Sequence, residues 1–128
     1  GAAFDGQAFP ALPGRRHVEL LYDQMPDVEN GMVKLSLAKD DVALVAAFLP
    51  VLTATKQDNH LEIRLNERYR PDMTLTCHDA ERDSRAAERP LTVRDGRAVI
   101  ACADFPGKRL IVKLRQGTDL IDQLVITL

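Results

Sequence analysis

The pattern of hydrophobic and polar positions predicts a chain built mainly of short β-strands. Several segments alternate apolar and polar residues, which is the period of a strand with one buried face. The predicted strands cover residues 17–22, 32–38, 60–65, 73–77, 91–94, 97–102, 108–115 and 120–128. Turn residues separate them. Seven or eight such strands favour an antiparallel two-layer β-sandwich, and an α+β roll is the alternative.

The segment Leu91–Cys102 predicts a β-hairpin. At its centre, Asp95-Gly96 tolerates the positive φ angles that a type I′ turn requires. The opposite pairs expected from this turn are Arg94 with Arg97, Val93 with Ala98, and Leu91 with Ile100. Because side chains alternate between the two faces, Cys102 is expected to point inward with Ile100.

Residues 40–49 fit two structures. Asp40 would cap a helix that Pro50 would end. The same stretch is apolar on all sides, which also fits a strand buried on both faces. We interpret it as a short helix, with the buried strand as the alternative.

Length and composition indicate one ordinary globular domain. The chain has 128 residues, of which 45% are hydrophobic and 28% charged. Residues 1–15 include Gly6, Pro10, Pro13 and Gly14 and predict an extended lead-in, so residues 16–128 would form a single β-rich domain. The longest apolar run, Val42–Leu52, is too short to span a bilayer, so no transmembrane segment is expected. A net charge of −2 and few aromatic residues argue against nucleic-acid binding.

Two cysteines predict a disulfide bond. Cys77 shares one strand face with Met73 and Leu75, and Cys102 faces inward from a strand predicted to be its neighbour. A Cys77–Cys102 disulfide would place the protein in an oxidising compartment. The start Gly1-Ala-Ala-Phe4 resembles a processed end, so we expect a secreted or periplasmic protein whose signal peptide has been removed. Two free thiols in a cytosolic protein are the alternative.

No catalytic or metal-binding motif stands out. Neither Ser36 nor Ser84 lies in a Gly-x-Ser-x-Gly elbow, and a phosphate-binding glycine loop is absent. His17, His60 and His78 lack the spacing of zinc ligands. We therefore predict no catalytic residue, no metal site and no cofactor.

The most distinctive feature of the sequence is its uneven distribution of charged residues. Residues 82–115 contain nine Lys or Arg against four Asp or Glu, a net charge of +5, which leaves −7 for the rest of the chain. The candidate ligand-binding residues are Arg94, Arg97, Arg109, Lys113 and Arg115. They would share one exposed face if the hairpin tip and the 108–115 strand were neighbours in one sheet. Such a face attracts anionic partners, although charged strands also deter edge-to-edge association.

These observations predict a non-catalytic, exported binding module. Its partner would be a protein or an anionic component of the cell envelope. A carrier of a small apolar ligand is the alternative, because residues 42–52 could line a cavity as well as fill a core. A small hydrolase with a site assembled from scattered Asp and His residues ranks third.

Overall fold

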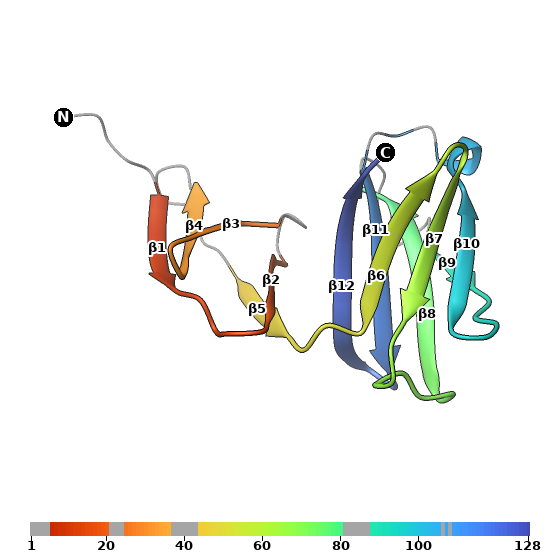
Figure 1. The fold of residues 1–128 in the computed structure, drawn as a ribbon, viewed down its shortest axis with the longest axis horizontal. Helices are drawn as coiled ribbons and strands as arrows, with labels where there is room; N and C mark the ends of the chain where they lie inside the picture. The colour runs from red at the N-terminus through yellow and green to blue at the C-terminus, as the bar shows by residue number, and fades with distance from the viewer. Residues whose placement is uncertain (1–5, 21–24, 37–43, 81–87, 106, 108) are drawn as a thin grey trace. The chain divides into compact units, whose positions relative to one another are not determined.

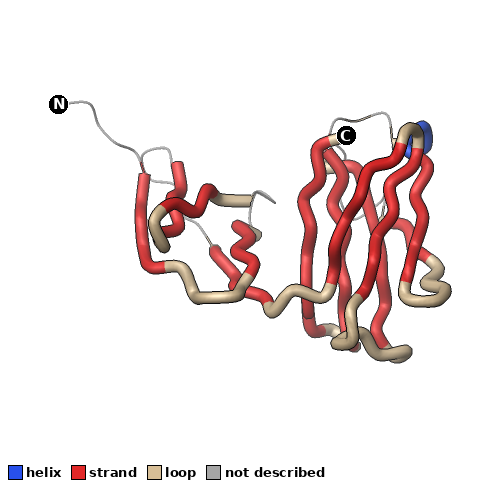
Figure 2. Tube along the Cα trace, viewed as in Figure 1, coloured by secondary structure: helices blue, strands red, loops and turns tan. Residues whose placement is uncertain are grey.

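A computed structural model of the chain describes residues 6–20, 25–36, 44–80, 88–105, 107 and 109–128 (Figures 1 and 2). These residues form antiparallel β-sheets and one short 3-10 turn, η1 (Cys102–Asp104), which confirms the mainly β class. The described ranges contain no helix that is long and apolar enough to cross a membrane. The chain packs as two compact units, Gly1–Leu49 and Pro50–Leu128. The assignment of residues 16–128 to a single domain stays a prediction.

The first unit contains two small sheets. One has the order β1-β4-β3, and the other pairs β2 with β5. The strand bounds are β1 (Gly6–Pro10), β2 (Arg16–Glu19), β3 (Asp27–Glu29), β4 (Met32–Ser36) and β5 (Val45–Phe48). Asn30 and Gly31 join β3 to β4 with φ angles of 52° and 73°, the left-handed region that a tight hairpin turn requires. Val18 of β2 and Val33 of β4 are fully buried.

The prediction of a helix over residues 40–49 is wrong for residues 45–48, which the structure describes as a strand. Residues 45–48 form β5, which runs antiparallel to β2 with Val45 opposite Glu19. Residues 40–43 lie outside the described residues. An apolar stretch satisfies a helix and a strand equally well, so pairing with a strand far away in the sequence decides between them. Within the expected lead-in, Gly6–Pro10 pairs with β4 as β1.

The second unit is the predicted two-layer sandwich, with seven strands. A three-stranded sheet has the order β10-β7-β6, and a four-stranded sheet has the order β12-β11-β8-β9 (Figure 1). The bounds are β6 (Leu52–Gln57), β7 (His60–Leu65), β8 (Met73–Asp79), β9 (Arg89–Leu91), β10 (Arg97–Ala101), β11 (Arg109–Gln116) and β12 (Asp119–Thr127). Every pair in both sheets is antiparallel.

The core of this unit lies between the two sheets. Alternation along each strand sends one set of side chains inward, as the sequence pattern predicts. The residues of β7, β8, β10 and β11 that are buried in this core are Leu61, Ile63, Leu75, Cys77, Ala98, Ile100, Leu110, Val112 and Leu114. They form one continuous cluster, which holds the sheets together by removing apolar surface from water.

One side of the sandwich, where β12 lies beside the start of β6, is held by a buried carboxylate. Asp122 of β12 is fully buried, and its Oδ2 accepts the backbone N–H groups of Val51 and Leu52 at 2.8 and 2.9 Å. Its Oδ1 accepts the N–H of Gln123 at 2.8 Å. A buried carboxylate is tolerated when hydrogen bonds replace its hydration. We call this the closed side.

The opposite side is bordered by β9 and β10, the outer strands of the two sheets, which are not hydrogen-bonded to each other. We call it the open side. Arg89 of β9 packs over the ring of Phe105, which follows η1, with its guanidinium carbon 4.9 Å from the ring centroid. Elsewhere on this side, the chain crosses from the four-stranded to the three-stranded sheet between Leu91 and Arg97.

The predicted hairpin exists only at its tip. Arg94 and Arg97 exchange two backbone hydrogen bonds of 2.8 and 3.0 Å, and Asp95 and Gly96 have φ angles of 52° and 70°. The tip therefore has the backbone that the dipeptide predicts.

The longer pairing predicted from this tip is wrong. Leu91 pairs with Leu75 of β8, and Ile100 pairs with Leu61 of β7, so neither Leu91–Ile100 nor Val93–Ala98 forms a pair. A turn dipeptide fixes only the local backbone. Beyond the tip, each arm gains more backbone hydrogen bonds from the sheet on its own side of the core.

Candidate functional site

The predicted disulfide is absent, and both cysteines are free thiols. Cys77 lies on β8 in the four-stranded sheet, whereas Cys102 has left β10 and begins η1. The N–H of Cys102 donates to the carbonyl of Asn59 at 2.9 Å. The prediction assumed neighbouring strands, and it fails because β8 and β10 belong to different sheets.

The thiol of Cys77 has low reactivity. Burial raises its pKa to about 11, and the nearby charge of Arg89 only partly opposes this effect. The thiolate is the reactive form of cysteine, so Cys77 is almost wholly unreactive at neutral pH. Cys102 is only partly buried and packs against the rim of the core.

The five candidate basic residues are divided between the two sheets. Arg94 and Arg97 flank the hairpin tip next to β10, whereas Arg109, Lys113 and Arg115 lie on β11 of the four-stranded sheet. The single sheet face expected from the sequence is therefore not formed. The role of these residues in ligand binding stays a prediction. Charge counted along the chain could not reveal this division, because it does not say which sheet each strand joins.

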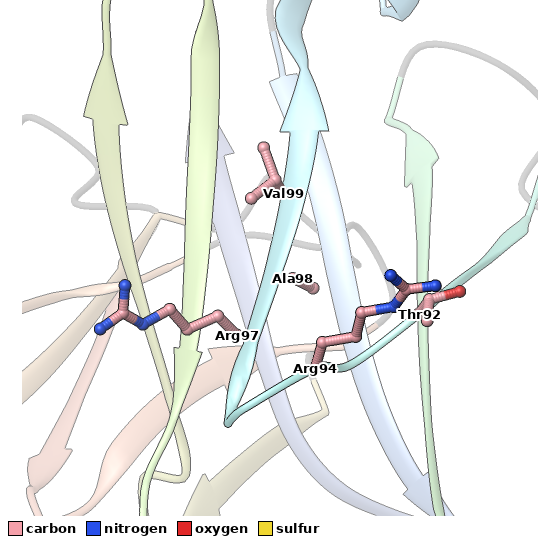
Figure 3. Close-up of a pocket in the computed structure, with 5 residues that line it drawn as sticks. All are labelled: Thr92, Arg94, Arg97, Ala98 and Val99. Atoms are coloured by element: carbon pink, nitrogen blue, oxygen red, sulfur yellow. The ribbon is translucent and has the colours of Figure 1, made fainter.

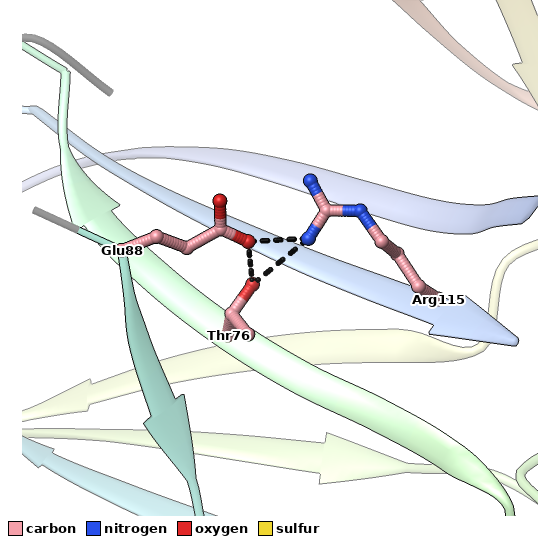
Figure 4. Close-up of polar contacts among 3 residues, drawn as sticks. All are labelled: Thr76, Glu88 and Arg115. Atoms are coloured by element: carbon pink, nitrogen blue, oxygen red, sulfur yellow. Dashed lines mark hydrogen bonds and ion pairs between the residues drawn. The ribbon is translucent and has the colours of Figure 1, made fainter. Parts of the chain in front are cut away.

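The β11 group is partly engaged in an internal network (Figure 4). Arg115 donates to the Glu88 carboxylate, and its Nη1 lies 3.4 Å from Thr76 Oγ1. The Thr76 hydroxyl donates to Glu88 Oε1 at 2.5 Å. Burial alone would raise the pKa of Glu88, but these hydrogen bonds and the charges of Arg115 and Lys113 outweigh it and lower the pKa. The network ties the start of β9 to β8 and β11.

At the hairpin tip, one arginine is paired and the other is not. Arg97 lies directly opposite Arg64 of β7, and like charges in this position repel. Glu62 relieves the repulsion: its Oε1 lies 2.7 Å from Arg64 Nε and 3.6 Å from Arg97 Nε. Arg94 is exposed and makes no ion pair with the part of the chain that the structure describes.

An open pocket of about 390 Å³ lies beside this tip (Figure 3). It is lined by Thr92, Arg94, Arg97, Ala98 and Val99, and we call it the wedge. It forms where the two arms of the hairpin part, one toward β8 and the other along β7. In Figure 3 the side chains of Arg94 and Arg97 extend to opposite sides, and that of Arg94 runs toward Thr92.

Val99 gives the wedge an apolar element. The residue is 63% exposed, the largest value among the exposed large hydrophobic residues of the described chain. Sequence analysis missed Val99 and Thr92 as site residues. The signal was available for Val99, because inward Ala98 and Ile100 leave the apolar side chain between them on the outer face.

The two histidines of the second unit lie on different sheets. His60 is exposed on β7, and His78 is buried on β8 in the other sheet. No group of three or more His, Cys, Asp or Glu among the described residues is placed to hold a metal ion. In the apolar run of residues 42–52, Val51 and Leu52 belong to the packed core, so the apolar-ligand carrier stays a prediction.

The wedge at the open side is thus the site that the described geometry offers, with two arginines around a pocket and an exposed valine beside them. Comparison of the chain with models of protein families, with curated proteins and with solved structures finds no match in any of the three.

Proposed function

We propose that the Pro50–Leu128 unit is a non-catalytic binding module that captures an acidic segment of a partner protein at the wedge. The observation that carries the proposal is the position of Arg94, an exposed arginine without an ion pair among the described residues, on a pocket beside exposed Val99. A free guanidinium and an apolar side chain next to each other suit a peptide that offers a carboxylate and an apolar group.

The composition of the wedge favours a protein segment over other anionic partners. Arg94 attracts any anion and accelerates encounter with it. Val99 adds an apolar contact that a phosphate or sulfate polymer would not use. No aromatic side chain lines the wedge, and aromatic rings are the usual stacking surface for nucleic-acid bases.

The proposal does not depend on export. Secretion or a periplasmic location was predicted largely from a disulfide, and the free thiols remove that support. Binding at the wedge would operate in any compartment.

The test is retention on immobilised poly-L-glutamate. The Arg94→Gln/Arg97→Gln variant is compared with a control variant, Lys56→Gln/Arg68→Gln, which loses the same charge from exposed positions outside the wedge. We expect the wedge variant to elute at a clearly lower salt concentration than the wild type and the control variant to elute with the wild type. Retention should also fall between 50 and 300 mM salt, since exposed charges are screened over about 10 Å near 0.1 M.

Equal retention of all three proteins would overturn the proposal. Stronger retention on heparin or on acidic lipid vesicles than on poly-L-glutamate, lost in the wedge variant, would redirect the site to a polysaccharide or a membrane.

A further inference from the structure

We infer that the acidic segment binds by adding as a β-strand to the free edge of β10. The inference rests on the proposed function and specifies how the wedge would hold its partner. An extended peptide that joins a sheet edge gains main-chain hydrogen bonds, while the neighbouring side chains give specificity.

The direction of the β10 backbone groups leads to this inference. Along a strand, the N–H and C=O groups of alternate residues point to opposite edges. Gly96 C=O accepts from Leu65, and Cys102 N–H donates to Asn59, so the even-numbered residues face β7. Arg97 exchanges its bonds with Arg94 on the other edge. By alternation, the N–H and C=O of Val99 face the free edge.

A third backbone group faces the same edge. The N–H of Ala101 points to the same edge as that of Val99, because the two residues are two positions apart on the strand. The C=O of Ala101, the N-cap residue of η1, instead accepts the first hydrogen bond of that turn. The described residues place no strand beside this edge beyond Arg94. Three backbone groups, the N–H and C=O of Val99 and the N–H of Ala101, therefore have no strand partner among the described residues, and they lie next to an exposed apolar side chain.

Arg94 fixes one end of the added strand. Because Arg94 occupies the edge position beside Arg97, an incoming segment pairs with Val99 and Ala101 and ends at the tip. Its end next to the tip meets Arg94, whose side chain extends from the tip toward Thr92, whereas Arg97 reaches over β7 toward Glu62 (Figure 3). Charge complementarity thus selects an extended segment with Asp or Glu at this end.

The other outer strands of the sandwich are less suited to this role. β9 has three residues, and its central Pro90 has no N–H to donate. β6 and β12 meet at the closed side, where Asp122 binds Val51 and Leu52. β10 carries only Arg97 as a charged residue, so it lacks most of the devices that deter strand addition.

The probe is a synthetic peptide with an alternating threonine–valine centre and two glutamates at each end, so that either orientation brings a carboxylate to Arg94. Its affinity is measured by calorimetry or fluorescence anisotropy. One derivative is N-methylated at the valines and another at the threonines. Alternate amides of a strand face opposite edges, so we expect about tenfold weaker binding for one derivative and nearly unchanged binding for the other.

A second arm changes the protein. Val99→Pro removes the N–H that faces the free edge and leaves the bonds to β7 in place, so we expect about tenfold weaker binding. The control Val99→Thr keeps the backbone and the branched shape, and we expect a smaller loss. Circular dichroism and thermal unfolding confirm that each variant is folded. The methylated peptides need no change in the protein and therefore decide the matter if Val99→Pro does not fold.

The outcomes separate this inference from the proposed function. If Arg94→Gln weakens binding but both methylated peptides and Val99→Pro bind normally, the acidic segment binds without strand addition and the inference is wrong. If the peptide does not bind although retention on poly-L-glutamate depends on the wedge, the inference is wrong and the proposed function stands; if neither depends on the wedge, both fail. A further outcome is that the protein forms dimers that the Val99→Pro substitution dissociates but that the peptide leaves intact. In that case the occupant of the edge is a second copy of the chain, which also overturns the inference.

Discussion

The two sides of the sandwich use polar groups in opposite ways. On the closed side, one fully buried carboxylate, that of Asp122, accepts three backbone N–H groups. On the open side, Arg94 and Arg97 are exposed to solvent. They lie beside the free edge of β10, which is bridged to Arg94 only at the hairpin tip. Both sides belong to the same pair of sheets, but among the described residues only the open side has a strand edge that leaves its neighbour beyond the hairpin tip.

This comparison teaches how one fold separates stability from recognition. A charge whose hydrogen bonds are all made within the protein has none left for a partner, and its removal costs stability. An exposed charge contributes little to stability and remains available for binding. We therefore expect substitution of the buried carboxylate on the closed side to change the free energy of unfolding most, and substitution of the exposed wedge arginines to change it little.

The largest effect is expected for Asp122→Ala. It leaves the N–H groups of Val51 and Leu52 buried without their acceptor, which should cost about 3 kcal/mol or more. Urea denaturation gives the free energy of unfolding. The control Asp122→Asn keeps one carbonyl acceptor and should cost clearly less. Equal losses of unfolding free energy in both variants would mean that the charge of Asp122, rather than its hydrogen-bond geometry, stabilises the closed side.

A smaller effect is expected at the turn that forms the wedge. Gly96 has a φ angle of 70°, and an added Cβ would lie an ordinary 3.5 Å from the carbonyl oxygen of Leu65. Backbone strain alone should therefore make Gly96→Val cost about 1–2 kcal/mol. Gly96→Asn is the control, because asparagine tolerates this conformation and should cost little. If valine and asparagine were equally tolerated in thermal unfolding, the tip would not require a left-handed residue.

The network that anchors β9 should contribute about 1 kcal/mol, in a pH-dependent way. Interactions lower the pKa of Glu88 in the folded state, so their contribution is present above the unfolded pKa of about 4.3 and is lost as the pH falls through the folded value. Glu88→Gln should thus be destabilised relative to wild type at pH 7, and the difference should shrink as the pH falls below about 4 and through the folded pKa of Glu88. A difference that stays constant over this pH range would contradict the assigned ion pair with Arg115.

The smallest effect concerns the cysteines. With both thiols free, a reducing agent should leave the melting temperature unchanged. A maleimide should label Cys102 in the folded protein and Cys77 only after denaturation, because Cys77 is buried and its pKa is raised. Cys102→Ser is the control for the site of labelling. An intact mass two hydrogens below that of the dithiol would restore the disulfide and the argument for export.

Sequence alternation predicted the strands β7, β8 and β11 from the period of two alone. It did not predict that Ile111 is buried as well, although Ile111 alternates with Leu110 and Val112. β6 was missed, since Thr53, Ala54 and Thr55 carry too little apolar contrast to show the period. β5 was misread because it is apolar on all sides.

Strand pairing was the part that alternation could not supply. The Asp95-Gly96 turn predicted its own backbone but not the separation of its arms, because the pairing partners of β9 and β10 lie far away in the sequence. The disulfide and the single basic face both depended on that pairing, and both were lost with it. Exposed Val99 is the feature of the site that alternation alone could have identified.

The closed side also bears on how fast the chain folds. Asp122 reaches Val51 across 71 positions of sequence, whereas β6 with β7 and β11 with β12 are joined by short turns. Local hairpins of this kind form within microseconds, but closing a long loop costs entropy before any contact repays it. The bonds of Asp122 should therefore form late, after both hairpins exist. The carboxylate whose loss is expected to cost the most stability would then do little to speed folding, and its loss would show mainly as faster unfolding.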